Sequence, residues 1–193
     1  MAALFHLQER EKIKIQMLEV GFELVKTHGM THTSVEKVTK EVGIGKGSFY
    51  QYFPTKEVFI YEIMVYQREQ MKRKFEQLLD NREKIPIEEA KQYLMEMMSL
   101  GKSITAYLTS DDINKLREKL PDEYFFAPEK DMLTTQKLLN HIEGVNENLD
   151  FKVVANLVKI IAITMESKEL LHEEALITTL QMLKSLLMNY IFG

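Results

Sequence analysis

The sequence of 193 residues contains no cysteine. The chain can therefore form no disulfide, and thiolate metal ligands and thiol nucleophiles are excluded. It also shows no strand-like alternation of apolar and polar residues, no low-complexity tract and no internal repeat. Apolar residues recur at helical spacing instead, and this pattern predicts an all-α fold.

Long hydrophobic runs and a targeting segment are missing as well. The most apolar stretch, residues 153–165, is interrupted by Asn156 and Lys159 and is too short to span a bilayer. The N-terminus reaches charged residues, Glu9 and Arg10, too early for the apolar region of a signal peptide. With 45% hydrophobic residues, the chain can still bury a sizeable core. We therefore expect a soluble, cytoplasmic protein without membrane contact.

The chain has no excess of basic residues, since its net charge is −4. Residues 1–78 contain 12 Lys and Arg against 10 Asp and Glu, a net charge of +2, whereas residues 79–193 contain 13 against 19, a net charge of −6. If the protein binds nucleic acid, a few placed contacts must supply the affinity, with help from neutral donors and helix N-termini. The charge distribution favours the N-terminal part for such contacts.

Two short helical patterns joined by a glycine occupy residues 33–59. In the first pattern, Val35, Val38 and Val42 share one face of a helix. Gly43 follows at the position where a left-handed residue commonly ends a helix. This first helix is expected to support the second one.

The second pattern opens at residues 45–48 and places Phe49 and Phe53 on one side of a helix that Pro54 stops. Its other faces carry a cation, a hydroxyl, an amide and phenols. Two short helices at a fixed angle, with such groups on the second, have the shape of a helix-turn-helix whose recognition helix enters a major groove. The spacing alone fits an ordinary helical hairpin in an all-α core equally well.

The residue types of this segment discriminate between these alternatives. The informative residues, in chain order, are Val38, Val42, Gly43, Ile44, Lys46, Gly47, Ser48, Phe49, Tyr50, Tyr52, Phe53, Lys56 and Glu57. In this order they resemble the N-terminal signature of the tetracycline-repressor (TetR) family of bacterial transcription regulators. One departure is Gly45, where the family more often carries a capping Ser or Thr, but glycine is itself a tolerated N-cap.

The resemblance implies an all-α protein of about nine helices in two parts. A three-helix, helix-turn-helix DNA-binding domain is expected over residues 1–54, with its first helix over residues 9–28. A larger helical domain for ligand binding and dimerisation follows over residues 55–193, and a linking helix over residues 55–81 leads into it.

Several side chains of the helix-turn-helix are candidates for DNA contacts. They are Thr33, Ser34, Lys46, Gly47, Ser48, Tyr50, Gln51, Tyr52 and Lys56. Lys46, Ser48 and Gln51 are expected at base edges, since lysine suits guanine and glutamine suits adenine. The two phenols, Thr33 and Lys56 suit phosphates. For Thr33 a second interpretation competes, because Thr33 and Glu36 also form the pattern of a capping box, which makes Thr33 the expected N-cap.

The rest of the chain predicts helices over residues 87–108, 111–120 and 129–142, and then over residues 151–170 and 173–192. The last two are apolar on nearly every side, whereas a helix that faces one core needs only one apolar stripe. We therefore expect a homodimer closed by a four-helix bundle of this pair and its copy. The alternative is a thick core within one chain.

By resemblance, the C-terminal domain encloses a cavity for a small molecule. The candidate lining residues are Tyr93, Met97, Met98, Tyr107, Phe125, Phe126 and Met132. Methionine adapts to irregular ligands, so these residues suit a largely apolar effector. Methionine and aromatic residues at helical spacing are also common in a plain core, and the sequence leaves that alternative open.

No constellation for catalysis is present in the sequence. One Glu-x-x-His match, Glu169 to His172, has the spacing of a bundle iron ligand, but a di-iron site needs two such motifs. We expect no enzymatic activity, no cofactor and no metal. The sequence thus predicts a ligand-responsive regulator, released as a repressor from a palindromic DNA operator when effector binds. The alternative is a helical small-molecule sensor or carrier that acts through a protein partner without reading DNA.

Overall fold

The computed structural model describes residues 2–99, 101, 103–125 and 127–193. These ranges contain nine α-helices and no β-strand, which confirms the all-α prediction. Contacts divide the chain into two compact units, Met1–Glu69 with Ser103–Leu120, and Gln70–Lys102 with Pro121–Gly193. The predicted functional boundary between residues 54 and 55 stays a prediction.

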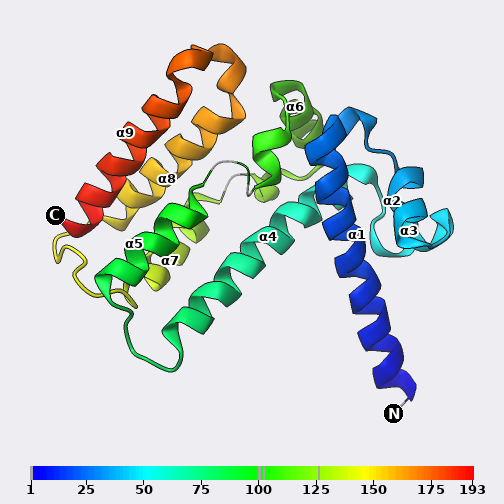
Figure 1. Cartoon of the computed structure of the whole chain (residues 1–193), viewed down its shortest axis with the longest axis horizontal. Helices are drawn as coiled ribbons and strands as arrows, with labels where there is room; N and C mark the ends of the chain where they lie inside the picture. Colours follow the sequence, from blue (N-terminus) through cyan, green and yellow to red (C-terminus); the bar gives the residue numbers. More distant parts are fainter. Residues whose placement is uncertain (1, 100, 102, 126) are drawn as a thin grey trace. The chain divides into compact units, whose positions relative to one another are not determined.

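The first unit contains the predicted helix-turn-helix. Its elements are α1 (Ala2–His32), α2 (Val35–Val42), α3 (Lys46–Tyr52), the first part of α4 (Lys56–Leu79), a 3-10 helix (Ile104–Tyr107) and α6 (Ser110–Lys119). In Figure 1, α2 and α3 lie beside α1. The first helix begins well before the predicted residue 9, in a segment of strong helix formers. It also continues past Gly29, which kinks it with φ 75° and ψ 165°.

Three phenylalanines form the core of this unit. The ring centroids of Phe49 and Phe53 lie 5.3 Å apart, and both rings lie within 5.1 Å of Phe59 at the start of α4. All three side chains are buried. Gly21 of α1 lies against this cluster, where a Cβ atom would come within 2.3 Å of Phe59 Cζ. The absence of a side chain at residue 21 therefore lets α1 approach the aromatic cluster.

The second unit contains the remaining helices. They are the second part of α4, α5 (Ile87–Met97), a 3-10 helix (Asp122–Tyr124), α7 (Pro128–Leu139), α8 (Phe151–Glu166), a 3-10 helix (Lys168–Leu170) and α9 (Glu173–Phe192). The prediction of one helix over residues 87–108 is wrong, because α5 stops at Met97 and Gly101 adopts a left-handed φ of 83°. The helix predicted over residues 151–170 also ends early, at Glu166.

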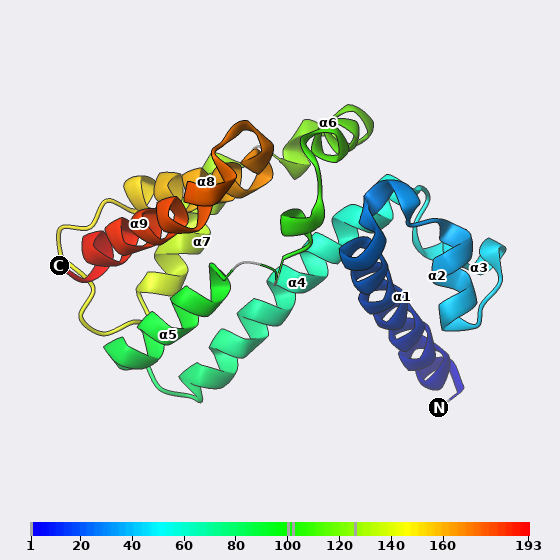
Figure 2. The same cartoon turned by 45° about the horizontal axis from the view of Figure 1, so that its top comes forward.

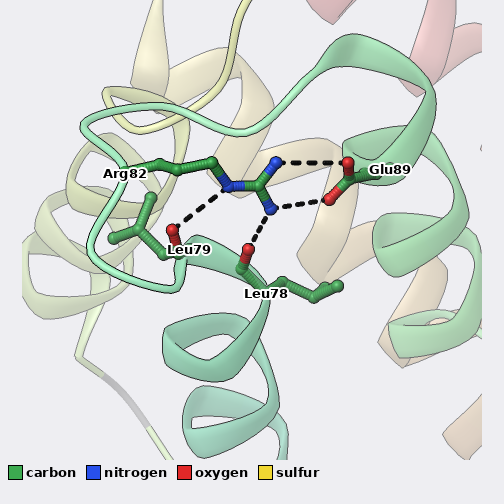
Figure 3. Close-up of polar contacts among 4 residues, drawn as sticks. All are labelled: Leu78, Leu79, Arg82 and Glu89. Carbon is green, nitrogen blue, oxygen red and sulfur yellow. Dashed lines mark hydrogen bonds and ion pairs between the residues drawn. The ribbon is translucent and has the colours of Figure 1, made fainter.

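The junction of α4 and α5 is held by Arg82 (Figure 3). Its Nε donates to the carbonyl of Leu79 at 3.3 Å, and one terminal nitrogen donates to the carbonyl of Leu78. The two terminal nitrogens also reach both carboxylate oxygens of Glu89, at 3.2 and 2.8 Å. The Arg82 hydrogen bond lowers the pKa of Glu89. One guanidinium thus caps the end of α4 and fixes the start of α5.

The last two helices leave a broad apolar face uncovered. Figure 2 shows α8 and α9 lying side by side, in agreement with their contacts. The exposed apolar residues of this face, each between 38% and 69% accessible, are Val153, Ile160, Ile163, Met182 and Leu186. Leu180, Leu187 and Ile191 form the buried stripe of α9. By length and composition, α9 is also the one helix in the described ranges that could cross a membrane.

Candidate nucleic-acid interface

The start of α2 is capped by a serine. Ser34 has extended backbone angles, and its hydroxyl accepts a hydrogen bond from the backbone N–H of Lys37 at 3.3 Å. The prediction that Thr33 is the N-cap is therefore wrong. The Thr33 hydroxyl is buried and donates to the carbonyl of Gly29 at 2.9 Å, so it closes the kink of α1 instead. Because the Thr33 hydroxyl is buried and already bonded, it is a weak candidate for a phosphate contact. Ser34 is only half-buried and is the better candidate of the two.

The turn between α2 and α3 has the predicted glycine geometry. Gly43 adopts φ 78° and ψ 30°, and its N–H donates to the carbonyls of Thr39 and Lys40 at 2.9 and 3.3 Å. A residue with a side chain would be strained in this left-handed conformation. Gly45 then serves as the N-cap of α3 without any side-chain hydrogen bond. The first N–H groups of α3 consequently have no side-chain cap to satisfy them.

The outer surface of α3 carries most of the predicted DNA contacts. Lys46, Gly47, Tyr50 and Gln51 are exposed, and Ser48 is half-buried. The Tyr50 side chain is 47% accessible although its ring packs edge-on against Phe49 at 5.4 Å. The structure therefore brings these candidate residues together on one short helix whose opposite side is anchored in the phenylalanine core.

An ion pair links the two helices of the motif. Lys46 Nζ at the start of α3 contacts Glu36 Oε1 of α2, and both side chains are mostly exposed. The hydrogen bond from Lys46 lowers the pKa of Glu36, and the same bond raises the pKa of Lys46. In the sequence, Glu36 fits only the pattern of a capping box, and this contact is not predicted. The pairing depends on the angle between α2 and α3, which spacing does not give.

Sequence reasoning also missed Arg10. Its guanidinium lies 5.2 Å from the centroid of the Tyr52 ring, and it donates to the carbonyl of Gln51 at 3.4 Å. This contact places a cation from α1 at the C-terminal end of α3, where positive charge complements the helix dipole. Tyr52, a predicted phosphate contact, is half-buried beneath it. Arg10 lies within the first helix predicted over residues 9–28, but helical spacing does not give its contact with α3.

Lys56 occupies a structural position as well as a candidate DNA position. It is half-buried, and its Nζ donates to the carbonyl of Met30, 2.6 Å away, near the kink of α1. Burial lowers the pKa of Lys56. The amine therefore ties the start of α4 to the end of α1, and a phosphate would have to share this donor.

We expect Lys56→Ala to weaken binding to every duplex by a similar factor and to reduce the salt slope of the binding constant by about one. Because the Met30 carbonyl loses its donor, we also expect a lower melting temperature. Fluorescence titrations over a salt series, together with thermal unfolding, measure both effects. An unchanged salt slope with a lower melting temperature would show that Lys56 is structural only.

The predicted effector residues are divided between the two compact units. Tyr93 and Met98 are buried in the second unit, and the Tyr93 hydroxyl donates to the Met71 carbonyl at 3.1 Å. Burial raises the pKa of Tyr93 to about 12. Met97 is exposed. Tyr107 belongs to the first unit and packs there.

Phe125 and Met132 do line a common hollow in the second unit, whereas Phe126 lies outside the described residues. The hollow has a volume of about 320 Å³. Its other lining residues are Ala127, Pro128, Glu129, Asp131, Lys152, Ala155, Asn156 and Lys159. Lys159 lies 3.8 Å from Asp131 and donates to the carbonyl of Phe125 at 3.4 Å. The hollow therefore combines an apolar side with charged groups of both signs.

The two short helices, the left-handed glycine between them and the exposed polar side of α3 define a helix-turn-helix of the kind that DNA-binding transcription regulators use. Residues 17–63 match the model of a family described as bacterial regulatory proteins, tetR family. This match falls on the helix-turn-helix segment, where the sequence predicted a resemblance to the TetR family.

Known relatives agree with this assignment. An uncharacterized HTH-type transcriptional regulator, YuxN of Bacillus subtilis (strain 168), is 37% identical over 60 residues, which are 31% of this chain and 20% of that protein. The match thus spans about a fifth of the length of that relative.

Solved structures share the fold over nearly the whole chain. One, described as the molecular basis for control of antibiotic production by bacterial hormones, has a TM-score of 0.65 at 18% identity and covers 94% of this chain and 98% of its own. The reduced form of E. coli NemR has a TM-score of 0.58 at 17% identity, with 93% and 97% covered. The fatty acid degradation regulator FadR from Bacillus halodurans also has a TM-score of 0.58 at 17% identity, with 91% and 94% covered.

Proposed function

We propose that this protein is a homodimeric repressor that reads a palindromic operator with two copies of α3 and leaves it when a small, largely apolar molecule binds the second unit. The observation that carries this proposal is the two-sided character of α3. Phe49 and Phe53 hold the helix rigidly from inside, while Lys46, Tyr50 and Gln51 remain exposed outside. A short helix that is fixed in this way can enter a major groove without losing further conformational entropy on binding.

We propose separate roles for the residues of this surface, some at base edges and some at the DNA backbone. Residues 1–78 have a net charge of only +2, and Lys46 is the sole lysine or arginine within α3, so one copy should bind DNA weakly. We propose that Lys46, Ser48 and Gln51 contact base edges, while Ser34, Tyr50, Tyr52 and Lys56 contact the DNA backbone. Gly47 carries no side chain, and a Cβ atom there would meet nothing within 4 Å, so the DNA backbone could approach α3 closely at this point.

The apolar face of α8 and α9 supports the second copy. Its exposed residues lie on two neighbouring helices, as a four-helix bundle between two protomers requires. A two-fold dimer would present two α3 helices to successive major grooves, about 34–36 Å apart or a multiple of that distance. Two weak interactions with half-sites then combine into one tight and specific interaction with the operator.

Release by an effector follows as a shift between two populations of the dimer. In one form of the dimer, the separation of the two α3 helices does not match that of successive major grooves. A ligand that binds this form more tightly lowers operator affinity, at most by the ratio of its affinities for the two forms. The hollow lined by Phe125 and Met132 is a candidate for the site. The linking helix α4 belongs to both compact units and is the segment that we propose transmits the change.

The experiment that tests the proposal is selection of duplexes from random DNA by the purified protein. The regulator should enrich a palindrome that it binds with nanomolar, salt-dependent affinity. No enrichment would favour a sensor or carrier that acts through a protein partner. Mass spectrometry of small molecules carried through purification then addresses the effector.

We expect Gln51→Ala to relax base preference at one position of each half-site, because an amide can bond adenine in two places and alanine cannot. The loss at the preferred base should be about 1–3 kcal/mol, with little change on duplexes that already carry another base there. Binding to the four base variants of that position measures the effect. An equal loss on all four variants would contradict a base contact by Gln51.

A further inference from the structure

The ion pair between Glu36 and Lys46 occupies the part of the proposed DNA surface where positive charge is most needed. Lys46 is the sole lysine or arginine within α3, and Glu36 projects from α2 to meet it. Neither side chain is buried, so solvent and a bound duplex can both reach the pair. A carboxylate at this place neutralises the lysine and repels phosphates.

An exposed ion pair of this kind adds little to stability, since water and salt screen it. Its effect on a polyanion is larger, because a phosphate that takes the lysine must leave the carboxylate unpaired. A guanine–cytosine base pair presents a different chemistry. Guanine O6 and N7 accept from lysine, and the cytosine amino group donates to a carboxylate. Such a base pair can satisfy both side chains together.

We propose that Glu36 is a specificity-determining residue, which withholds Lys46 from the phosphates of random DNA and presents it, with its own carboxylate, to a guanine–cytosine pair of the operator. This inference rests on the proposed function. It differs from a structural role for Glu36, because the pair contributes by raising the cost of wrong sites as well as by contacting the right one.

The test compares Glu36→Gln with the wild-type protein on the selected palindrome and on a random-sequence duplex over a salt series. Glutamine keeps the size of the side chain and removes its charge. On random DNA the freed lysine should steepen the salt slope by about 0.9 and strengthen binding about threefold. The ratio of operator to random affinity should fall about tenfold or more, and preference for one guanine–cytosine pair should weaken.

Two further variants separate this effect from a simple change in net charge. Glu23 of α1 has the same accessibility as Glu36, 62%, and contacts an exposed lysine, Lys26, at 3.4 Å. Glu23→Gln removes one negative charge from the same unit outside α2 and α3, and it should leave the salt slope and the affinity ratio unchanged. The double variant Glu36→Gln, Lys46→Gln should return the slope on random DNA to the wild-type value.

The outcomes distinguish this inference from the proposed function. If the wild-type protein selects a palindrome but Glu36→Gln leaves slope and ratio unchanged, or shifts them only as far as Glu23→Gln does, the role of Glu36 is overturned alone. A steeper slope that persists in the double variant also overturns it. If the wild-type protein selects no duplex, the proposed function fails, and the inference fails with it.

Discussion

Leu186→Glu should convert the protein from a dimer to a monomer and abolish tight operator binding. Leu186 lies on the exposed side of α9, on the face that we propose meets a second copy. In a two-fold bundle, the substitution would bury two unpaired carboxylates near each other. The dissociation constant of the dimer should rise at least about 100-fold. Sedimentation velocity measured over a concentration series would detect the change.

Operator affinity should fall when dimerisation is lost, because each monomer then binds one half-site without a linked second protomer on the other half-site. Leu133→Glu is the matched control. Leu133, on α7 of the same unit, is 48% accessible against 54% for Leu186 and lies outside the α8–α9 face. The control should remain dimeric. A monomeric wild-type protein, equal effects of the two variants, or recovery of the wild-type protein with membranes would contradict the proposed role of this face.

The second large effect is expected at the phenylalanine core. Phe49 is fully buried, and its ring contacts both Phe53 and Phe59. Phe49→Ala would remove most of that ring and leave a cavity that the neighbouring rings cannot easily fill. We expect a loss of about 3–5 kcal/mol in the stability of the first unit.

The loss should appear as a fall of about 10 °C in the melting temperature, followed by circular dichroism. Tyr50→Ala is a useful control, because Tyr50 is the next residue on the same helix and its side chain is 47% accessible, whereas that of Phe49 is fully buried. It should change the melting temperature by a small fraction of that amount. Equal shifts for the two variants would show that α3 is not anchored from the side that we describe.

The sequence predicted the helix-turn-helix well because its signals are local. The left-handed Gly43 and the pairing of Phe49 with Phe53 follow from residue type and helical period. The capping residue was predicted one position early. Thr33 and Ser34 are both good N-caps, and the choice depended on the Gly29 carbonyl, which the kink of α1 brings to Thr33.

Contacts between distant segments were beyond the sequence. Helical spacing gives the buried face of a helix but not the element that covers it. For this reason Lys56 was predicted as a DNA contact without its bond to the Met30 carbonyl. Tyr107 and Tyr93 were likewise assigned to one pocket, although the end of α5 and the following turn place them in different compact units. The apolar excess of the last helices was predictable because it is a property of composition.

The most direct test of a dimeric DNA-reading regulator is binding of the purified protein to its selected palindrome and to two altered duplexes. One duplex has a scrambled half-site, and the other has five base pairs inserted between the half-sites, which places them on opposite sides of the helix. We expect two protomers on the intact palindrome, with affinity at least about 100-fold lower on both altered duplexes. Equal affinity for all three duplexes would contradict it.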